Sequence, residues 1–190
     1  MIDLNEFAKE VHENAVAHGW WETERPTEEI IALIHSEWSE ALEEYRAGRT
    51  MIWYRCDVCG GVCDGLCSEL YCKEYKSRKP EGIAVELIDG CIRILDYLAY
   101  VKYDDIELLP SEIVFGIRKE TSVPLLVSDL HYWTAISARC CGGVEEKNLV
   151  FALSVAFAWI EENGLDPESI MREKHEYNKT RPYKHGGKVC

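Results

Sequence analysis

Residues 30–45 have the sequence IIALIHSEWSEALEEY, in which apolar side chains return every three or four positions. That spacing places the apolar residues on one face of an α-helix. The helix should start after Pro26, with Thr27 as its N-cap, and should stop at Gly48. A second stretch, IAVELIDGCIRILDYL at 83–98, is apolar nearly all round, which predicts a helix that is buried on every side.

The rest of the chain also shows mostly helical patterns. No alternation of strands and helices is visible, so the sequence predicts an all-α helical bundle that forms one domain over residues 1–190. The last helix should begin at Asp166-Pro167-Glu168, where Asp caps the helix and Pro takes its first position. The remaining helices are predicted over residues 7–18, 125–139 and 145–162.

The composition narrows the functional class. The 34 acidic residues outnumber the 21 basic ones, so the formal net charge is −13, while 47% hydrophobic residues suffice for a core. Broad nucleic-acid binding is therefore not expected, because it requires a basic face. No signal peptide is visible, and the longest apolar run, 149–160, is too short to cross a bilayer. We expect a cytoplasmic protein with neither a membrane nor a nucleic acid as partner.

Acidic residues on the two apolar helices form a pattern of their own. Glu37 and Glu40 are three positions apart with Glu44 following a turn later, and Glu86 and Asp89 repeat the spacing. Ionised carboxylates gathered on apolar helices repel one another unless a cation neutralises them, and hard oxygen ligands suit Mg²⁺ or Mn²⁺. The alternative is that these acids are solvated helix faces without a ligand. Spacing alone leaves the two interpretations about equal.

The same residues carry a family resemblance. Leu33-Ile-His-Ser-Glu37-Trp-Ser-Glu40 and Glu81-Gly-Ile-Ala-Val-Glu86-Leu-Ile-Asp89 resemble the paired Glu-x-x-Glu and Glu-x-x-Asp motifs of the MazG-like all-α nucleoside triphosphate pyrophosphohydrolases. Segments 12–21 and 174–188 extend the resemblance. It implies a MazG-type bundle that hydrolyses an NTP or dNTP to the monophosphate and pyrophosphate. It also implies a homo-oligomer, most simply a dimer.

The resemblance also assigns roles by position. Glu37, Glu40, Glu86 and Asp89 would ligate Mg²⁺, and either Glu40 or Glu37 would instead orient the attacking water as the catalytic carboxylate. Trp20 and Trp21 would stack on the base, although core or dimer packing is the alternative for both. The basic C-terminal segment, 172–190, could contact the triphosphate, with a solvated basic terminus as the alternative. The full set of candidate substrate-binding residues is Trp20, Trp21, Glu44, Arg93, Lys174, Asn178, Arg181 and Lys188.

A cysteine-rich segment separates the two acidic helices. We interpret residues 51–79 as an insertion, in which Cys56 and Cys59 open a group of five cysteines. Four thiolates could hold Zn²⁺, with free thiols, local disulfides or an iron–sulfur cluster as alternatives. A competing function follows, namely a non-catalytic helical binding module that recognises a partner through this segment. The five candidate ligands are Cys56, Cys59, Cys63, Cys67 and Cys72.

Overall fold

The computed structural model describes residues 2–56, 62, 78–114, 121–138 and 145–187. Over these residues the chain is mostly helical, as predicted, with one small two-stranded sheet in addition. None of the described helices is long and apolar enough to span a membrane. The elements are α1 (Leu4–Ala17), α2 (Thr27–Arg46), β1 (Trp53–Cys56), β2 (Arg78–Glu81), α4 (Ile83–Tyr100), α5 (Val123–Ser137), α6 (Glu146–Glu162), α7 (Pro167–Lys179) and α8 (Lys184–Gly187).

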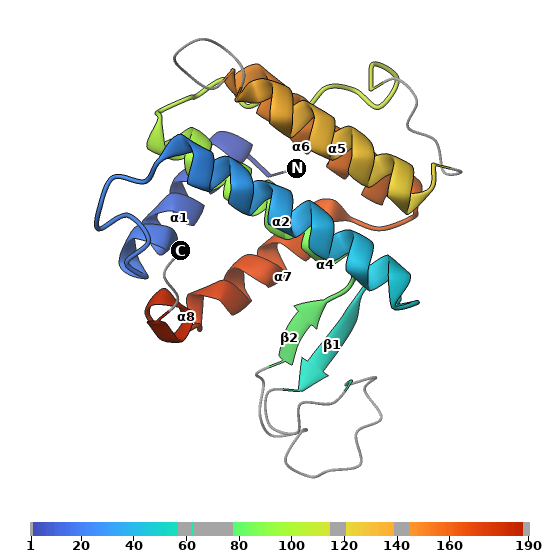
Figure 1. Cartoon of the computed structure of the whole chain (residues 1–190), viewed down its shortest axis with the longest axis horizontal. Helices are drawn as coiled ribbons and strands as arrows, with labels where there is room; N and C mark the ends of the chain where they lie inside the picture. Colours follow the sequence, from blue (N-terminus) through green and yellow to red (C-terminus); the bar gives the residue numbers. More distant parts are fainter. Residues whose placement is uncertain (1, 57–61, 63–77, 115–120, 139–144, 188–190) are drawn as a thin grey trace.

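Helix α4 is the centre of the bundle. It packs against α1, α2, α6 and α7, and most of its side chains are buried, which confirms the burial predicted from its sequence. Figure 1 shows α5 and α6 side by side along one flank of the α2–α4 pair, and α7 on the other flank. The hairpin formed by α5 and α6 is the one expected from the sequence.

A glycine sets the distance between α2 and α4. A Cβ atom built at Gly90 would lie 2.3 Å from Cζ3 of Trp38, so the indole occupies the space that a side chain would need. Trp38 is fully buried, and its Nε1 donates to Oγ1 of Thr134 on α5 at 2.9 Å. Trp38 is therefore a core residue that holds three helices together, and the close approach at Gly90 brings the acidic faces of α2 and α4 into register.

The ends of the helices follow the sequence in most places. Asp166 caps α7 by accepting from the backbone N–H of Glu168, with Pro167 at the first position as predicted. The structure corrects the start of α2: Thr27 is already helical, and the N-cap position belongs to Pro26, whose side chain forms no capping hydrogen bond. Proline has no side-chain acceptor, and its backbone carbonyl instead accepts from the N–H groups of Glu29 and Ile30.

The small sheet departs from a purely α-helical fold. β1 and β2 pair antiparallel, with Trp53 opposite Glu81 and Cys56 opposite Arg78. These strands are the two ends of the predicted insertion, and they extend from the bundle at the end of α2 (Figure 1). Aromatic residues at the start of β1 favour an extended backbone.

The C-terminal segment docks on the end of α1. The backbone N–H of Lys184 donates to the carbonyl of His18 at 3.1 Å, and Nε2 of His18 donates to the carbonyl of Arg181 at 2.9 Å. The Tyr183 ring lies where a side chain at Gly19 would be. A short helix, α8, follows this contact within the basic C-terminal segment.

Candidate functional site

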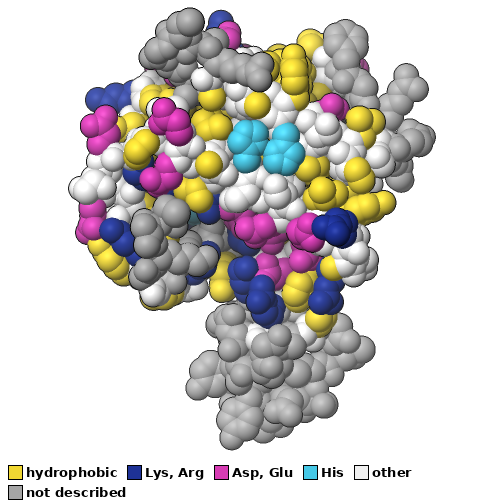
Figure 2. All heavy atoms as spheres, viewed as in Figure 1, with side chains coloured by type: hydrophobic (Ala, Val, Ile, Leu, Met, Phe, Trp, Pro, Cys, Tyr) yellow, Lys and Arg dark blue, Asp and Glu magenta, His cyan; other side chains and the backbone are white. Residues whose placement is uncertain are grey.

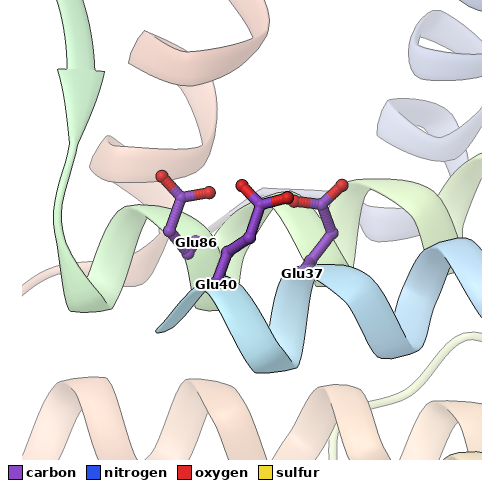
Figure 3. A group of neighbouring side chains, drawn as sticks. All are labelled: Glu37, Glu40 and Glu86. Atoms are coloured by element: carbon purple, nitrogen blue, oxygen red, sulfur yellow. The ribbon is translucent and has the colours of Figure 1, made fainter. Parts of the chain in front are cut away.

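Three carboxylates from α2 and α4 converge at one place. Glu37, Glu40 and Glu86 each offer one oxygen, and these oxygens lie within 4.8 Å of one another. Figure 3 shows the side chains of Glu37 and Glu40 rising from α2 beside that of Glu86 from α4. Glu37 and Glu86 are buried, whereas Glu40 is exposed. The spacing predicted from the sequence thus brings three of the four expected metal ligands together.

The fourth expected ligand, Asp89, has a different neighbour. Its Oδ2 lies 2.8 Å from Nζ of Lys174, a residue of α7 that is only 1% exposed. Lys174 also donates to the carbonyl of Pro80 at 3.1 Å. Asp89 lines the same cleft as the three glutamates but lies outside their close cluster. Lys174 is therefore an internal counter-ion of the acidic group.

A second cation pairs with the cluster. Nε of Arg93 on α4 donates to Oε1 of Glu37, so one end of the Glu37 carboxylate is already engaged. None of the described residues forms a salt bridge or a side-chain hydrogen bond with Glu40. The two carboxylates of the Glu-x-x-Glu pair therefore differ in environment, since one is buried and paired whereas the other faces solvent.

The three carboxylates line a cleft with a volume of about 270 Å³. Its walls come from α1, α2, α4, α7, β2 and the segment between α1 and α2. Figure 2 shows acidic and basic side chains gathered together on this face of the molecule, next to the base of the insertion. The charged residues that line the cleft are Arg25, Glu37, Glu40, Lys79, Glu86, Asp89, Arg93, Asp96 and Arg181.

Burial changes the proton affinity of these groups. Burial, reinforced by the charge of Asp89, raises the pKa of Glu86 to about 8. Burial also raises the pKa of Glu37, although the neighbouring Arg93 opposes the shift. Burial lowers the pKa of Lys79, and the charge of Lys174 adds to the effect. A group of buried carboxylates whose charges are incompletely balanced has a net attraction for a cation.

The stability of the metal-free protein should therefore depend on pH through Glu86. Between its ordinary pKa of 4.5 and about 8, folded protein keeps a proton on Glu86 that unfolded protein has released. The contribution of Glu86 to stability should accordingly fall as pH rises through this range, by at most about 1.4 kcal/mol per pH unit. Urea unfolding in EDTA at pH 5 to 8 measures this slope. Glu86→Gln should flatten the slope, and an unchanged slope in that variant would contradict the assignment.

The tryptophans separate into two environments. Trp20 lines the cleft, with the Arg25 guanidinium 5.9 Å from its ring centre. Trp21 does not line it, because the indole stacks on Tyr100 at 4.1 Å and donates to Asp96 at 2.9 Å. Only Trp20 is therefore placed to meet a ligand in the cleft.

The other predicted substrate-binding residues are also divided. Asn178 and Arg181 line the cleft, as does Arg93. Glu44 does not, and it accepts a hydrogen bond from Nε1 of Trp53 on β1 instead. Residues through Lys179 of the basic C-terminal segment belong to α7. Lys188 lies outside the described residues.

The cysteine prediction falls mostly outside the described part of the chain. Cys56 is buried at the end of β1, opposite Arg78 of β2. Cys59, Cys63, Cys67 and Cys72 are not among the described residues, so zinc binding stays a prediction.

The structure adds cleft residues that the sequence did not single out. Arg25 and Lys79 contribute positive charge, and His175 contributes a buried imidazole on α7. His175 is three positions before Asn178. This helical spacing could have indicated that His175 lies on the same face as Asn178. Lys79 had no such signal, because its position depends on the pairing of β2 with β1.

Comparison with known proteins adds no assignment, since no family model, no curated protein and no solved structure matches this chain.

Proposed function

We propose that this protein is a Mg²⁺-dependent pyrophosphohydrolase that converts an NTP or dNTP to the monophosphate and pyrophosphate, as its resemblance to the MazG-like enzymes implies. The observation that carries the proposal is the convergence of Glu37, Glu40 and Glu86 within 4.8 Å at the wall of a cleft. A nucleoside triphosphate suits such a cleft because its charge requires both cations and basic side chains.

The donor set fits magnesium. All three converging groups are carboxylates, the hard oxygen ligands that Mg²⁺ prefers over nitrogen or sulfur, and Mn²⁺ accepts the same set. A bound cation would neutralise charge on the triphosphate and acidify a water molecule. Glu37 and Glu86 would hold it, and Asp89, one turn from Glu86, would be a further ligand.

Other side chains of the cleft would bind the substrate and position the attacking water. Arg25, Lys79 and Arg181 line the cleft and would bind phosphate oxygens, which fixes the position of the triphosphate. Arg93 holds Glu37 in place through their hydrogen bond. Glu40 is exposed and unpaired among the described residues, so we assign it, rather than Glu37, to orient the attacking water and accept its proton.

A substrate panel tests the proposal. Purified protein is incubated with each NTP and dNTP in Mg²⁺, and the nucleotide product, pyrophosphate and inorganic phosphate are measured together. We expect equal amounts of monophosphate and pyrophosphate from the preferred substrates, and no products when EDTA replaces Mg²⁺. Release of inorganic phosphate instead of pyrophosphate, or no hydrolysis of any nucleotide, would contradict the proposal.

The homo-oligomer expected from the resemblance stays a prediction. Sedimentation of the purified protein measures its mass in solution, and a dimer is the expected result.

A further inference from the structure

Two residues of α7 that line the cleft each have a buried polar atom without a hydrogen-bond partner among the described residues. The two atoms are Nε2 of His175 and Oδ1 of Asn178. Both residues line the cleft, and His175 is only 2% exposed. A buried polar group without a partner costs free energy, so such atoms in a folded protein usually await a ligand or a water molecule.

The two residues are arranged as one unit. They lie three positions apart on α7, which places them on the same face of the helix about one turn apart. The ring of Phe7 on α1 meets the His175 imidazole edge to face, with 5.1 Å between ring centres. This contact fixes the imidazole plane, so His175 presents Nε2 in a restricted direction.

The hydrogen-bonding capacity of these two atoms limits which chemical group they can bind. Oδ1 of Asn178 only accepts hydrogen bonds, so its partner must be a donor, which an ionised phosphate is not. Burial lowers the pKa of His175, which favours a neutral imidazole that can donate from Nε2. A hydroxyl group both donates and accepts at one oxygen atom, and it therefore matches the hydrogen-bonding needs of both kinds of protein atom.

The position on α7 points to the sugar. Lys174, the residue before His175, contacts Asp89 of the carboxylate group, so this part of α7 lies beside the proposed triphosphate site. In a nucleotide the sugar is the part next to the triphosphate. Trp20 lines the same cleft, where a base could stack on its ring.

We propose that His175 and Asn178 form a subsite that binds a hydroxyl group of the nucleoside sugar. This inference rests on the proposed pyrophosphohydrolase function and adds to it a requirement on the sugar. The substrate class is therefore nucleotides that keep at least one free sugar hydroxyl.

Sugar analogues test the subsite without any mutation. We expect kcat/KM of the wild-type protein to fall by about 10- to 100-fold from a dNTP to the 2′,3′-dideoxynucleotide with the same base, because the buried atoms then stay unpaired. If the ribonucleotide and the dNTP differ instead by this factor in favour of the ribonucleotide, the 2′-hydroxyl is the group bound, and the subsite stands. Equal kcat/KM for all three sugars overturns the inference while pyrophosphate release still supports the proposed function. No hydrolysis of any nucleotide overturns both.

Variants then assign the effect to α7. His175→Phe keeps a ring against Phe7 but removes the nitrogen. The measured quantity is the ratio of kcat/KM for the preferred nucleotide to kcat/KM for the analogue that lacks the bound sugar hydroxyl. In His175→Phe this ratio should be close to one. His175→Gln, which keeps a donor, should retain part of the ratio, and Asn178→Leu provides a second variant if His175→Phe does not fold. Glu176→Gln, at an exposed neighbouring position, is the matched control and should leave the ratio unchanged. A variant that lowers activity equally for every sugar, or that changes preference among bases only, would overturn the assignment.

Discussion

Glu86→Gln is expected to lower kcat for pyrophosphate release by about 1000-fold without lowering the stability of the metal-free protein at pH 8. The loss follows because the buried carboxylate is one of the three that converge and is assigned to the cation, and an amide carries no charge to hold the cation. Stability should be retained or increased because burial raises the pKa of Glu86 to about 8, which means that its charged form is unfavourable in the folded protein. The measurements are steady-state kinetics in Mg²⁺ and thermal unfolding in EDTA.

Two further variants test whether the loss of activity is specific to the carboxylate cluster. Glu37→Gln should also lose at least about 100-fold in kcat, since it removes a second ligand. Glu43→Gln is the matched control, because Glu43 is an exposed glutamate of the same helix and lies outside the cleft. It should retain wild-type activity. Full activity in both Glu37→Gln and Glu86→Gln would show that the carboxylate cluster is not the catalytic site.

Lys174→Met is expected to destabilise the protein by about 3–5 kcal/mol. The ammonium group is buried between Asp89, 2.8 Å away, and the carbonyl of Pro80. Methionine has a similar length but leaves Asp89 without its counter-ion beside a second buried acid, Glu86. Both acids raise the pKa of Lys174 against the opposing effect of burial, which shows how strongly the site favours a cation there. Urea unfolding at neutral pH in EDTA measures the difference.

A double variant separates lost charge pairing from lost packing. Asp89→Asn combined with Lys174→Met removes both partners and should recover most of the stability. Lys179→Met is the control on the same helix, where an exposed lysine pairs with Glu176 at 2.6 Å, and it should change stability by less than about 1 kcal/mol. If Lys174→Met is as stable as the wild type, the account of Lys174 as an internal counter-ion is wrong.

The sequence predicts the helices because each has a local signal. The region 83–98 is apolar on all sides, and α4 is accordingly the buried centre of the bundle. Asp166 and Pro167 mark the start of α7 through local hydrogen bonding and a fixed φ angle. The small sheet is less evident, because strands as short as β1 and β2 form only when both ends of the insertion meet.

The candidate site could be predicted only in part. Helical spacing places Glu37 and Glu40 on one face, and Gly90 permits the approach that brings Glu86 to them. The pairing of Asp89 with Lys174 depends on where α7 crosses α4, more than 80 positions along the chain, and no local pattern encodes it. The same holds for the separation of Trp20 from Trp21, which are adjacent in sequence but have different neighbours.

The structure divides the acidic residues behind the net charge of −13 into two groups. Many of the acids are ordinary exposed residues, such as Glu43 and Glu176, which pair with basic side chains on their own helices. Glu37, Glu86 and Asp89 instead line one cleft, where among the described residues Arg93 pairs directly with Glu37 and Lys174 with Asp89. The cleft of an acidic protein can therefore take an anionic substrate when divalent cations accompany it.

Hydrolysis of the preferred nucleotide in ¹⁸O-labelled water with Mg²⁺ tests the central claim most directly, since it locates the phosphorus atom that water attacks. Mass spectrometry of the products identifies which of them carries the label. The account predicts that ¹⁸O enters the nucleoside monophosphate and that the pyrophosphate stays unlabelled, because attack occurs at the α-phosphorus. Label in pyrophosphate or inorganic phosphate, or the absence of any hydrolysis, would contradict it.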